Sequence, residues 1–79
     1  MSLKRHFSRD ILFARTEIRQ LTQQQVADAV TISLREYQKI EKGELLPRTE
    51  IFLRLVFFFD LEIQSYRKEV TKHASVHSR

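Results

Sequence analysis

Residues 21–43, LTQQQVADAVTISLREYQKIEKG, decide the fold of this 79-residue chain. Two segments within this stretch have the spacing of a capping box, in which two side chains satisfy each other's free backbone amides at the start of a helix. The two segments are Thr22 to Gln25 and Ser33 to Glu36. The stretch therefore predicts two helices that begin close together.

These starts predict a helix-turn-helix unit. The first helix is expected at about 23–30 and the second at about 34–42, because Gly43 can take the left-handed conformation that ends a helix. Apolar residues recur in and between both helices: Val26, Ala27, Val30, Ile32, Tyr37 and Ile40. This spacing lets the two helices cross over a shared core and leaves the polar face of the second free to enter a DNA major groove.

Helices are also predicted on both sides of this unit. Apolar residues at helical spacing behind Ser8 indicate a first helix over about 8–20, and they are Ile11, Ala14, Ile18 and Leu21. Pro47 favours the start of a fourth helix, over about 48–59, where its missing amide costs nothing. A weaker fifth helix begins at Asp60 or Glu62 and carries Ile63, Tyr66 and Val70 on one face.

The two ends are expected to lie outside the folded domain. Residues 1–7 contain Lys4, Arg5 and His6 and are interpreted as a basic arm. Residues 71–79 have no apolar periodicity and are predicted to be disordered. The folded part of the chain is therefore predicted to be one helix-turn-helix domain over residues 8–70.

The composition supports an all-α fold, because one glycine and one proline are too few for the turns of a sheet protein. Without cysteine, the chain offers no disulfide, zinc–thiolate site or thiol nucleophile. The longest apolar run, residues 55–59, is far shorter than the roughly 20 residues that span a bilayer, and no signal-peptide core follows the N-terminus. A soluble cytoplasmic protein without a membrane segment is expected.

The net charge of +4 suits a polyanion or an acidic partner. No nucleophile–base–acid grouping, glycine-rich phosphate loop or carboxylate pair indicates an enzyme. His73 and His77 are four residues apart, but no third metal ligand accompanies them. No metal or cofactor is therefore predicted.

The motifs LTQxxVA and YxxIExG, joined by the turn before Ser33 and followed by Pro47, resemble those of the lambda-repressor-like family. This family comprises DNA-binding domains of phage repressors, Cro proteins and bacterial regulators of the xenobiotic-response-element type. The resemblance covers about residues 8–70 and implies an all-α, compact five-helix domain with its helix-turn-helix at about 23–42. It makes helix 34–42 the recognition helix and lays helix 23–30 across the DNA backbone.

The resemblance also assigns roles to single residues. Leu34, Arg35 and Lys39 occupy the positions that read base edges: Arg35 suits bidentate contact with guanine, Lys39 guanine O6 or N7, and Leu34 a thymine methyl. Phosphate contacts are implied for Gln23, Ser33, Lys42 and Arg48. The alternative is that these are ordinary exposed side chains, with Leu34 packed against Val30.

Two acidic residues in the second helix are interpreted differently. Glu36 would repel phosphate and is taken as the capping partner of Ser33. Glu41 faces back toward the first helix, where the family pairs this glutamate with an arginine, and Arg15 is the candidate. The alternative for Glu41 is an ordinary exposed acid.

Three departures from the family pattern are visible. Thr31 and Asp60 stand where glycine is usual, so the backbone there must avoid or tolerate a left-handed conformation. The link from Arg15 to Leu21 is one residue longer than usual, which leaves open the register of the first helix and the pairing of Arg15 with Glu41.

The run LVFFFD, residues 55–60, places three aromatic rings in three directions. At about 100° per residue, Phe59 falls on the core face, Phe58 beside Ile51, and Phe57 nearly opposite the core. An exposed large apolar group on a small domain often marks an interface. A self-association surface is predicted from Ile51, Phe57, Phe58 and Tyr66, unless the fifth helix or the arm covers it.

These observations predict a sequence-specific DNA-binding transcriptional regulator of bacterial or phage origin. It would act as a repressor and bind double-stranded DNA at a palindromic operator as a homodimer. The alternative is a protein-interaction module of the same fold, from an antitoxin or coregulator, whose main partner is another protein. An RNA-binding domain would need exposed aromatic residues on the basic face, and none is evident there.

Overall fold

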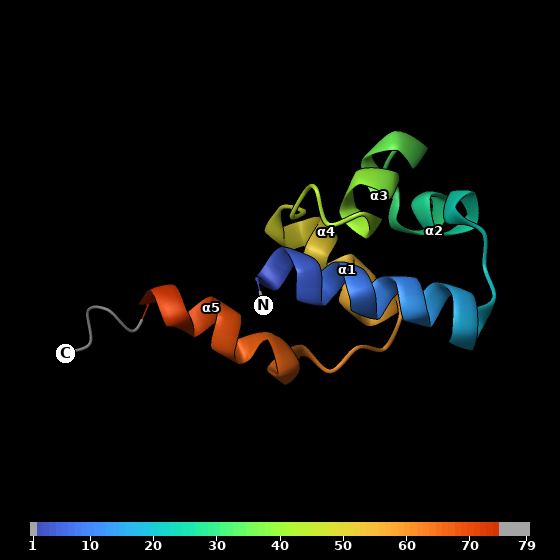
Figure 1. Cartoon of the computed structure of the whole chain (residues 1–79). Coiled ribbons are helices and arrows are strands. Elements are labelled where there is room, and N and C mark those ends of the chain that lie inside the picture. The colour runs from blue at the N-terminus through green and yellow to red at the C-terminus, as the bar shows by residue number, and fades with distance from the viewer. Residues whose placement is uncertain (1, 75–79) are drawn as a thin grey trace.

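The structure, a computed structural model, describes the backbone of residues 2–74 and the side chains of residues 2–71, and it contains only helices and loops there. The predicted all-α, five-helix architecture is confirmed. In chain order the elements are α1 (Leu3–Phe13), the π-helical η1 (Ala14–Arg19), α2 (Gln23–Val30), α3 (Leu34–Glu41), α4 (Thr49–Phe58), the 3-10 turn η2 (Ile63–Tyr66) and α5 (Arg67–Ala74) (Figure 1).

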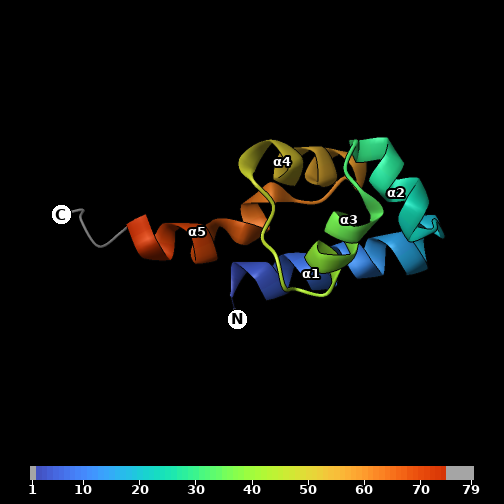
Figure 2. The same ribbon diagram turned by 90° about the horizontal axis from the view of Figure 1, so that it is seen from above.

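The helix-turn-helix unit rests on α1 and α4. α3 packs against both α1 and α2, and α2 also contacts α4. α5 leads away from the other helices in two perpendicular views (Figures 1 and 2). No helix within the described residues is long and apolar enough to cross a membrane.

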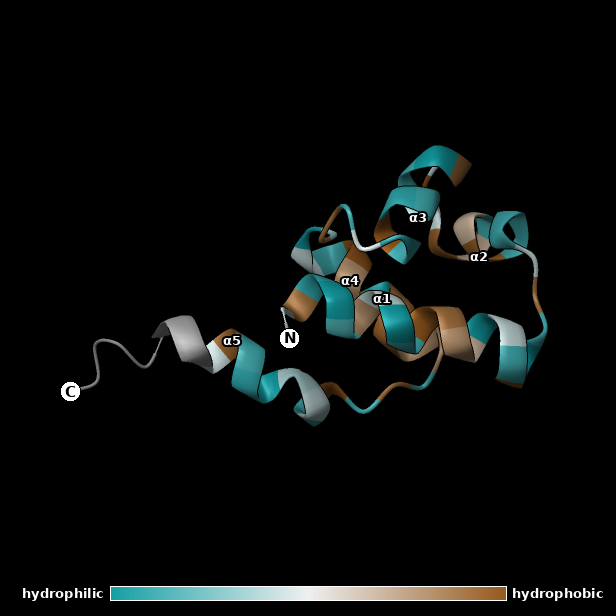
Figure 3. Ribbon diagram, viewed as in Figure 1, coloured by the Kyte–Doolittle hydropathy of each residue, from teal (hydrophilic) through white to brown (hydrophobic). Residues whose placement is uncertain are grey.

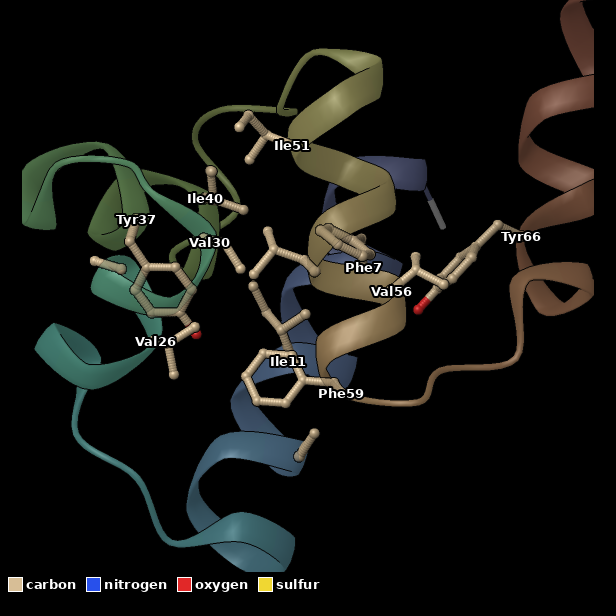
Figure 4. Packing of buried hydrophobic residues seen from close by; sticks show 13 residues of the cluster. Phe7, Ile11, Val26, Val30, Tyr37, Ile40, Ile51, Val56, Phe59 and Tyr66 are labelled. Atoms are coloured by element: carbon tan, nitrogen blue, oxygen red, sulfur yellow. The ribbon is translucent and has the colours of Figure 1, made fainter.

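One hydrophobic core joins all these elements except α5 (Figure 4). Its buried members are Phe7, Ile11, Ala14, Val26, Ala27, Val30, Tyr37, Ile40, Ile51, Leu55, Val56, Phe59 and Tyr66. Every apolar residue predicted for the helix-turn-helix core is among them except Ile32, which is half-buried. Hydropathy colouring shows the contrast between α4, which is largely apolar, and α3, which is largely polar (Figure 3).

The predicted helix ends agree closely with the structure. Both bonds of the Thr22–Gln25 capping box form: the Gln25 amide donates to Thr22 Oγ1 at 3.0 Å, and the Thr22 amide donates to Gln25 Oε1 at 2.8 Å. At α3 the Glu36 amide donates to Ser33 Oγ at 3.0 Å, but the Glu36 side chain makes no return bond to the Ser33 amide, so only half of the predicted Ser33–Glu36 box forms. Gly43 follows α3 with φ 80°, the left-handed conformation expected of it.

The first helix begins earlier than predicted. Ser2 caps α1, accepting from the Arg5 amide at 3.2 Å, and the helix starts at Leu3 rather than at about residue 8. Phe7 is buried, with its ring centroid 4.5 Å from that of Phe52. Residues 3–7 are therefore part of the folded domain and not a free basic arm, because the apolar spacing of Ile11 continues upstream through Phe7.

The last turn of the first helix is π-helical. In η1 the amides of Gln20 and Leu21 both approach the Arg15 carbonyl, and Gln20 has φ 54°. A π turn holds one residue more per hydrogen bond than an α turn, so the extra residue noted between Arg15 and Leu21 is absorbed here. The wider turn rotates Ile18 outward to 65% exposure, and its prediction as a core-facing residue is wrong.

Both positions where the chain lacks an expected glycine are left-handed. Thr31 has φ 63° and Asp60 has φ 56°, a conformation that is costly for a β-branched residue such as Thr31. Arg54 Nη1 donates to the Val30 carbonyl at 3.0 Å and to Thr31 Oγ1 at 2.9 Å. The turn between α2 and α3 is thus held by a side chain from α4.

The phenylalanine run separates as its helical phase predicts. Phe59 is buried, whereas Phe57 is 71% exposed. Phe58 is half-buried beneath the guanidinium of Arg19, which lies 4.8 Å from the ring centroid. Arg19 Nη1 also donates to the Phe58 carbonyl at 2.6 Å, so η1 covers Phe58 and leaves Phe57 uncovered in the single chain.

Two residues of the predicted self-association surface are buried instead. Ile51 is 1% exposed because it faces the shared core. Tyr66 is 1% exposed because η2 turns it inward, where its hydroxyl donates to Asp10 Oδ2 at 2.6 Å. Neither side chain can contribute to a surface of the folded chain.

The C-terminal prediction needs a partial correction. The fifth helical region starts after Glu62, one of the two positions expected, and α5 continues through residues 71–74, which were predicted to be disordered. Residues 75–79 of the predicted tail, including His77, lie outside the described residues, as does the side chain of His73.

Phe7 and Phe13 provide a matched test of whether the first helix begins at Leu3 and buries Phe7. Phe7→Ala should lower the free energy of unfolding by about 3–5 kcal/mol, because it leaves a cavity in the core. Phe13 is 58% exposed, so Phe13→Ala should change stability by about 0.5 kcal/mol or less. Urea unfolding followed by circular dichroism measures both, and equal effects would contradict the buried position of Phe7.

Candidate nucleic-acid interface

The outer face of α3 is basic. Arg35, Lys39 and Lys42 follow one another at intervals of about one helical turn each, and all three side chains are exposed. Tyr37 and Ile40 lie on the opposite side and are buried. The helix is therefore anchored by its apolar face and presents cations to the solvent.

This basic face is hollowed rather than flat. An open cleft lies along it, lined by Arg35, Gln38, Lys39, Lys42 and Glu44. The lining contains three cations and one carboxylate, so its charge favours an anionic ligand. Leu34 and Glu36, at the start of the same helix, are half-buried.

The other predicted phosphate-binding positions lie at helix starts. Gln23 is the first residue of α2, Ser33 caps α3, and Arg48 precedes α4 without a side-chain capping bond. The amides at a helix start carry partial positive charge and are suited to phosphate. Ser33 and Arg48 are exposed, whereas Gln23 is half-buried.

Glu41 stands behind the basic face and joins three elements. Arg15 from η1 donates to it through Nε at 2.7 Å and through Nη2 at 2.9 Å, the bidentate geometry that favours an arginine–carboxylate pair. Tyr37 Oη donates to Oε2 at 2.6 Å, and Gln23 Nε2 donates to Oε1 at 2.8 Å. Arg15 also donates to the Leu21 carbonyl at 3.0 Å, so the pair ties the end of η1 to α2 and α3.

The hydrogen bonds keep this carboxylate ionised. Burial by itself raises the pKa of Glu41, but hydrogen bonds from Arg15, Tyr37 and Gln23 outweigh it and hold the pKa below its ordinary value. Burial, together with the hydrogen bond to Glu41, raises the pKa of Tyr37 above its ordinary value. The hydrogen bond to Glu41 likewise raises the pKa of Arg15. All three groups therefore keep their protonation states at neutral pH.

Two participants in this network were not identified from the sequence. The Tyr37 hydroxyl binds Glu41 one helical turn later, and the i, i+4 spacing of a tyrosine and a carboxylate could have indicated it. Gln38 Nε2 donates to Gln23 Oε1 at 3.1 Å. No sequence pattern pointed to that bond, because it joins two helices across a turn.

The chain belongs to the lambda-repressor-like helix-turn-helix family. The family's model, described as Helix-turn-helix, matches residues 14–65, which is well over half of the chain and includes all of α2, α3 and α4. It is therefore a DNA-binding domain of the transcription-regulator class. No curated protein and no solved structure matches the chain significantly.

Glu41→Gln should destabilise the fold by about 3–5 kcal/mol, because it leaves Arg15, with 15% of its side chain exposed, beside a neutral amide. The lowered pKa means that the folded state binds this proton less readily than the unfolded state. The stabilisation from Glu41 is therefore complete above its ordinary pKa, 4.5, and is lost as the pH falls through the lower folded-state value.

Urea unfolding across this acid range measures the effect. Wild-type stability should fall more steeply with acid than that of Glu41→Gln. Glu44→Gln, at an exposed position, should retain the wild-type slope. If the free energies of unfolding of wild type and Glu41→Gln fell equally steeply with acid, the ionised, hydrogen-bonded state of Glu41 would be contradicted.

Proposed function

We propose that this chain is a transcriptional repressor that binds a palindromic operator as a homodimer. The observation that carries the proposal is the basic outer face of α3, held in a fixed orientation by the Glu41 network. In such a dimer the two copies of α3 would enter successive major grooves, with half-site centres about 10 bp apart. A repressor bound there would occupy DNA needed for transcription.

Several residues of α3 suit distinct contacts with DNA. Arg35 would donate two hydrogen bonds to guanine, Lys39 would reach guanine O6 or N7, and Leu34 would contact a thymine methyl. Phosphate contacts would come from Gln23, Ser33, Lys42 and Arg48. Phosphate neutralisation makes the affinity fall steeply as salt is raised.

Substitutions at Arg35 and Gln23 should change the affinities for cognate and random DNA in different ways. Arg35→Ala should weaken cognate binding by about 1–3 kcal/mol and relax the preference at one base pair, because it removes a base contact. Gln23→Ala should weaken cognate and random duplexes by similar factors. Fluorescence anisotropy with both duplexes measures each change, and a wild-type affinity for either variant would remove that residue from the interface.

The proposed dimer surface centres on Phe57. This side chain is 71% exposed, and its neighbour Phe58 is half-buried under Arg19. A large aromatic group left in water favours contact with a second apolar surface. A symmetric dimer would place the two Phe57 patches against each other.

Phe57→Lys should convert the dimer to monomer, because it would bring two cations together at the two-fold axis. Sedimentation equilibrium measures the dissociation constant of each protein. Phe13→Lys is the matched control, since Phe13 is also exposed and the same charge is added there. If the Phe57→Lys variant dimerised as tightly as the wild type, Phe57 would not be part of the interface.

A protein-interaction module is the alternative function. A groove between α1, η1 and the segment after α4 favours it, because the exposed Phe13 and Ile18 line this groove together with Phe59 and Leu61. Such a module could hold an apolar segment of a partner protein. A wild-type protein without measurable affinity for any DNA duplex would favour this alternative over the repressor.

A further inference from the structure

Two glutamine side chains connect the start of α2 to the middle of α3, the two helices that are proposed to meet DNA. Gln38 Nε2, on α3, donates to Gln23 Oε1, on α2, at 3.1 Å. Gln23 Nε2 then donates to Glu41 Oε1 at 2.8 Å. Gln23 and Gln38 are both half-buried, and Glu41 is buried.

These bonds allow only one orientation of the Gln23 carboxamide. An ionised carboxylate can only accept hydrogen bonds, and the –NH₂ of Gln38 can only donate to its neighbour. If the Gln23 amide were turned by half a rotation, its oxygen would face Glu41 and its nitrogen would face the Gln38 –NH₂. The contact with Glu41 would then be repulsive, because a carboxylate only accepts, whereas Gln38 could turn its own carboxamide to accept. Glu41 therefore sets the orientation of the Gln23 carboxamide, and the bond from Gln38 restrains the position of its carbonyl end.

The fixed orientation leaves a donor available. The carboxamide nitrogen of Gln23 carries two N–H groups, and Glu41 accepts from one of them. Because the amide is planar, the direction of the second N–H is fixed once the first is engaged. A phosphate oxygen is an acceptor that this second N–H could bind without breaking either existing bond.

We propose that Gln38 is a positioning residue for DNA binding: it holds the Gln23 carboxamide so that one N–H points to a backbone phosphate. The inference rests on the proposed phosphate contact of Gln23. Gln38 lines the same cleft as Arg35 and Lys39, and its carboxamide is bonded to Gln23 on α2. The competing role is direct readout, because glutamine can form two hydrogen bonds with adenine.

A double-mutant cycle distinguishes positioning from direct contact. Gln38→Leu removes the donor at similar volume, and Gln23→Leu removes the phosphate contact. Gln38→Leu alone should weaken binding to cognate and random duplexes alike, by about 2–10-fold, the range for one net hydrogen bond. In the Gln23→Leu background, Gln38→Leu should cause no further loss, because its effect passes through Gln23.

Additive losses, or a loss confined to the cognate duplex, would overturn the inference and make Gln38 a DNA-contacting residue. Gln38→Met, whose unbranched side chain also lacks a donor, repeats the cycle if the leucine variant unfolds. A wild type that binds no duplex would overturn the proposed function itself, whereas wild-type binding with additive losses overturns only the positioning role.

The free protein gives a second readout that needs no DNA. Hydrogen exchange of the Gln23 side-chain amide, followed by NMR, should be slowed in the wild type and become faster in Gln38→Leu. Gln24→Leu is the matched control, because Gln24 is on the same helix but bonds to Asp28 at 2.8 Å. An exchange rate at Gln23 that does not respond to Gln38→Leu would contradict the positioning role.

Discussion

The ionised carboxylate of Glu41 is the interaction on which the rest of this domain depends. It accepts hydrogen bonds from Arg15, Tyr37 and Gln23, and so joins η1, α2 and α3 at one point. A buried charge is costly unless it is paired and hydrogen-bonded, and here both oxygens have partners. The pair therefore sets the angle of α3 against the other helices, and with it the direction of the basic face.

Unfavourable backbone conformations occur at the connections between the helices that hold this arrangement. η1 absorbs an extra residue by widening to a π turn, which lets Arg15 reach Glu41 while Gln20 takes a left-handed conformation. Thr31 is left-handed between α2 and α3, where Arg54 binds the turn. These positions depart from favoured backbone geometry, whereas α2 and α3 have regular N-terminal caps. The helices that would meet DNA are thus the regular part of the structure.

Much of the fold could be predicted from local signals. The capping box at Thr22, the serine cap at Ser33 and the stop at Gly43 act within a few residues, so they located α2 and α3 closely. The resemblance also implied that Arg15 faces Glu41, and the two side chains are in bidentate contact. Two of the misplaced residues lie instead where the helices are irregular. Ile18 points outward because η1 is a π turn, and Tyr66 points inward because η2 is a 3-10 turn. Both turns break the α-helical period from which the positions of these residues were predicted.

Repeated selection from random duplexes with the purified protein shows most directly whether a symmetric pair of α3 helices recognises DNA. The expected result is an enriched inverted repeat whose half-site centres lie about 10 bp apart, with guanine at a position that Arg35→Ala no longer selects. Sequences that remain random after repeated selection, at a salt concentration where the protein retains the duplex, would contradict specific readout through α3.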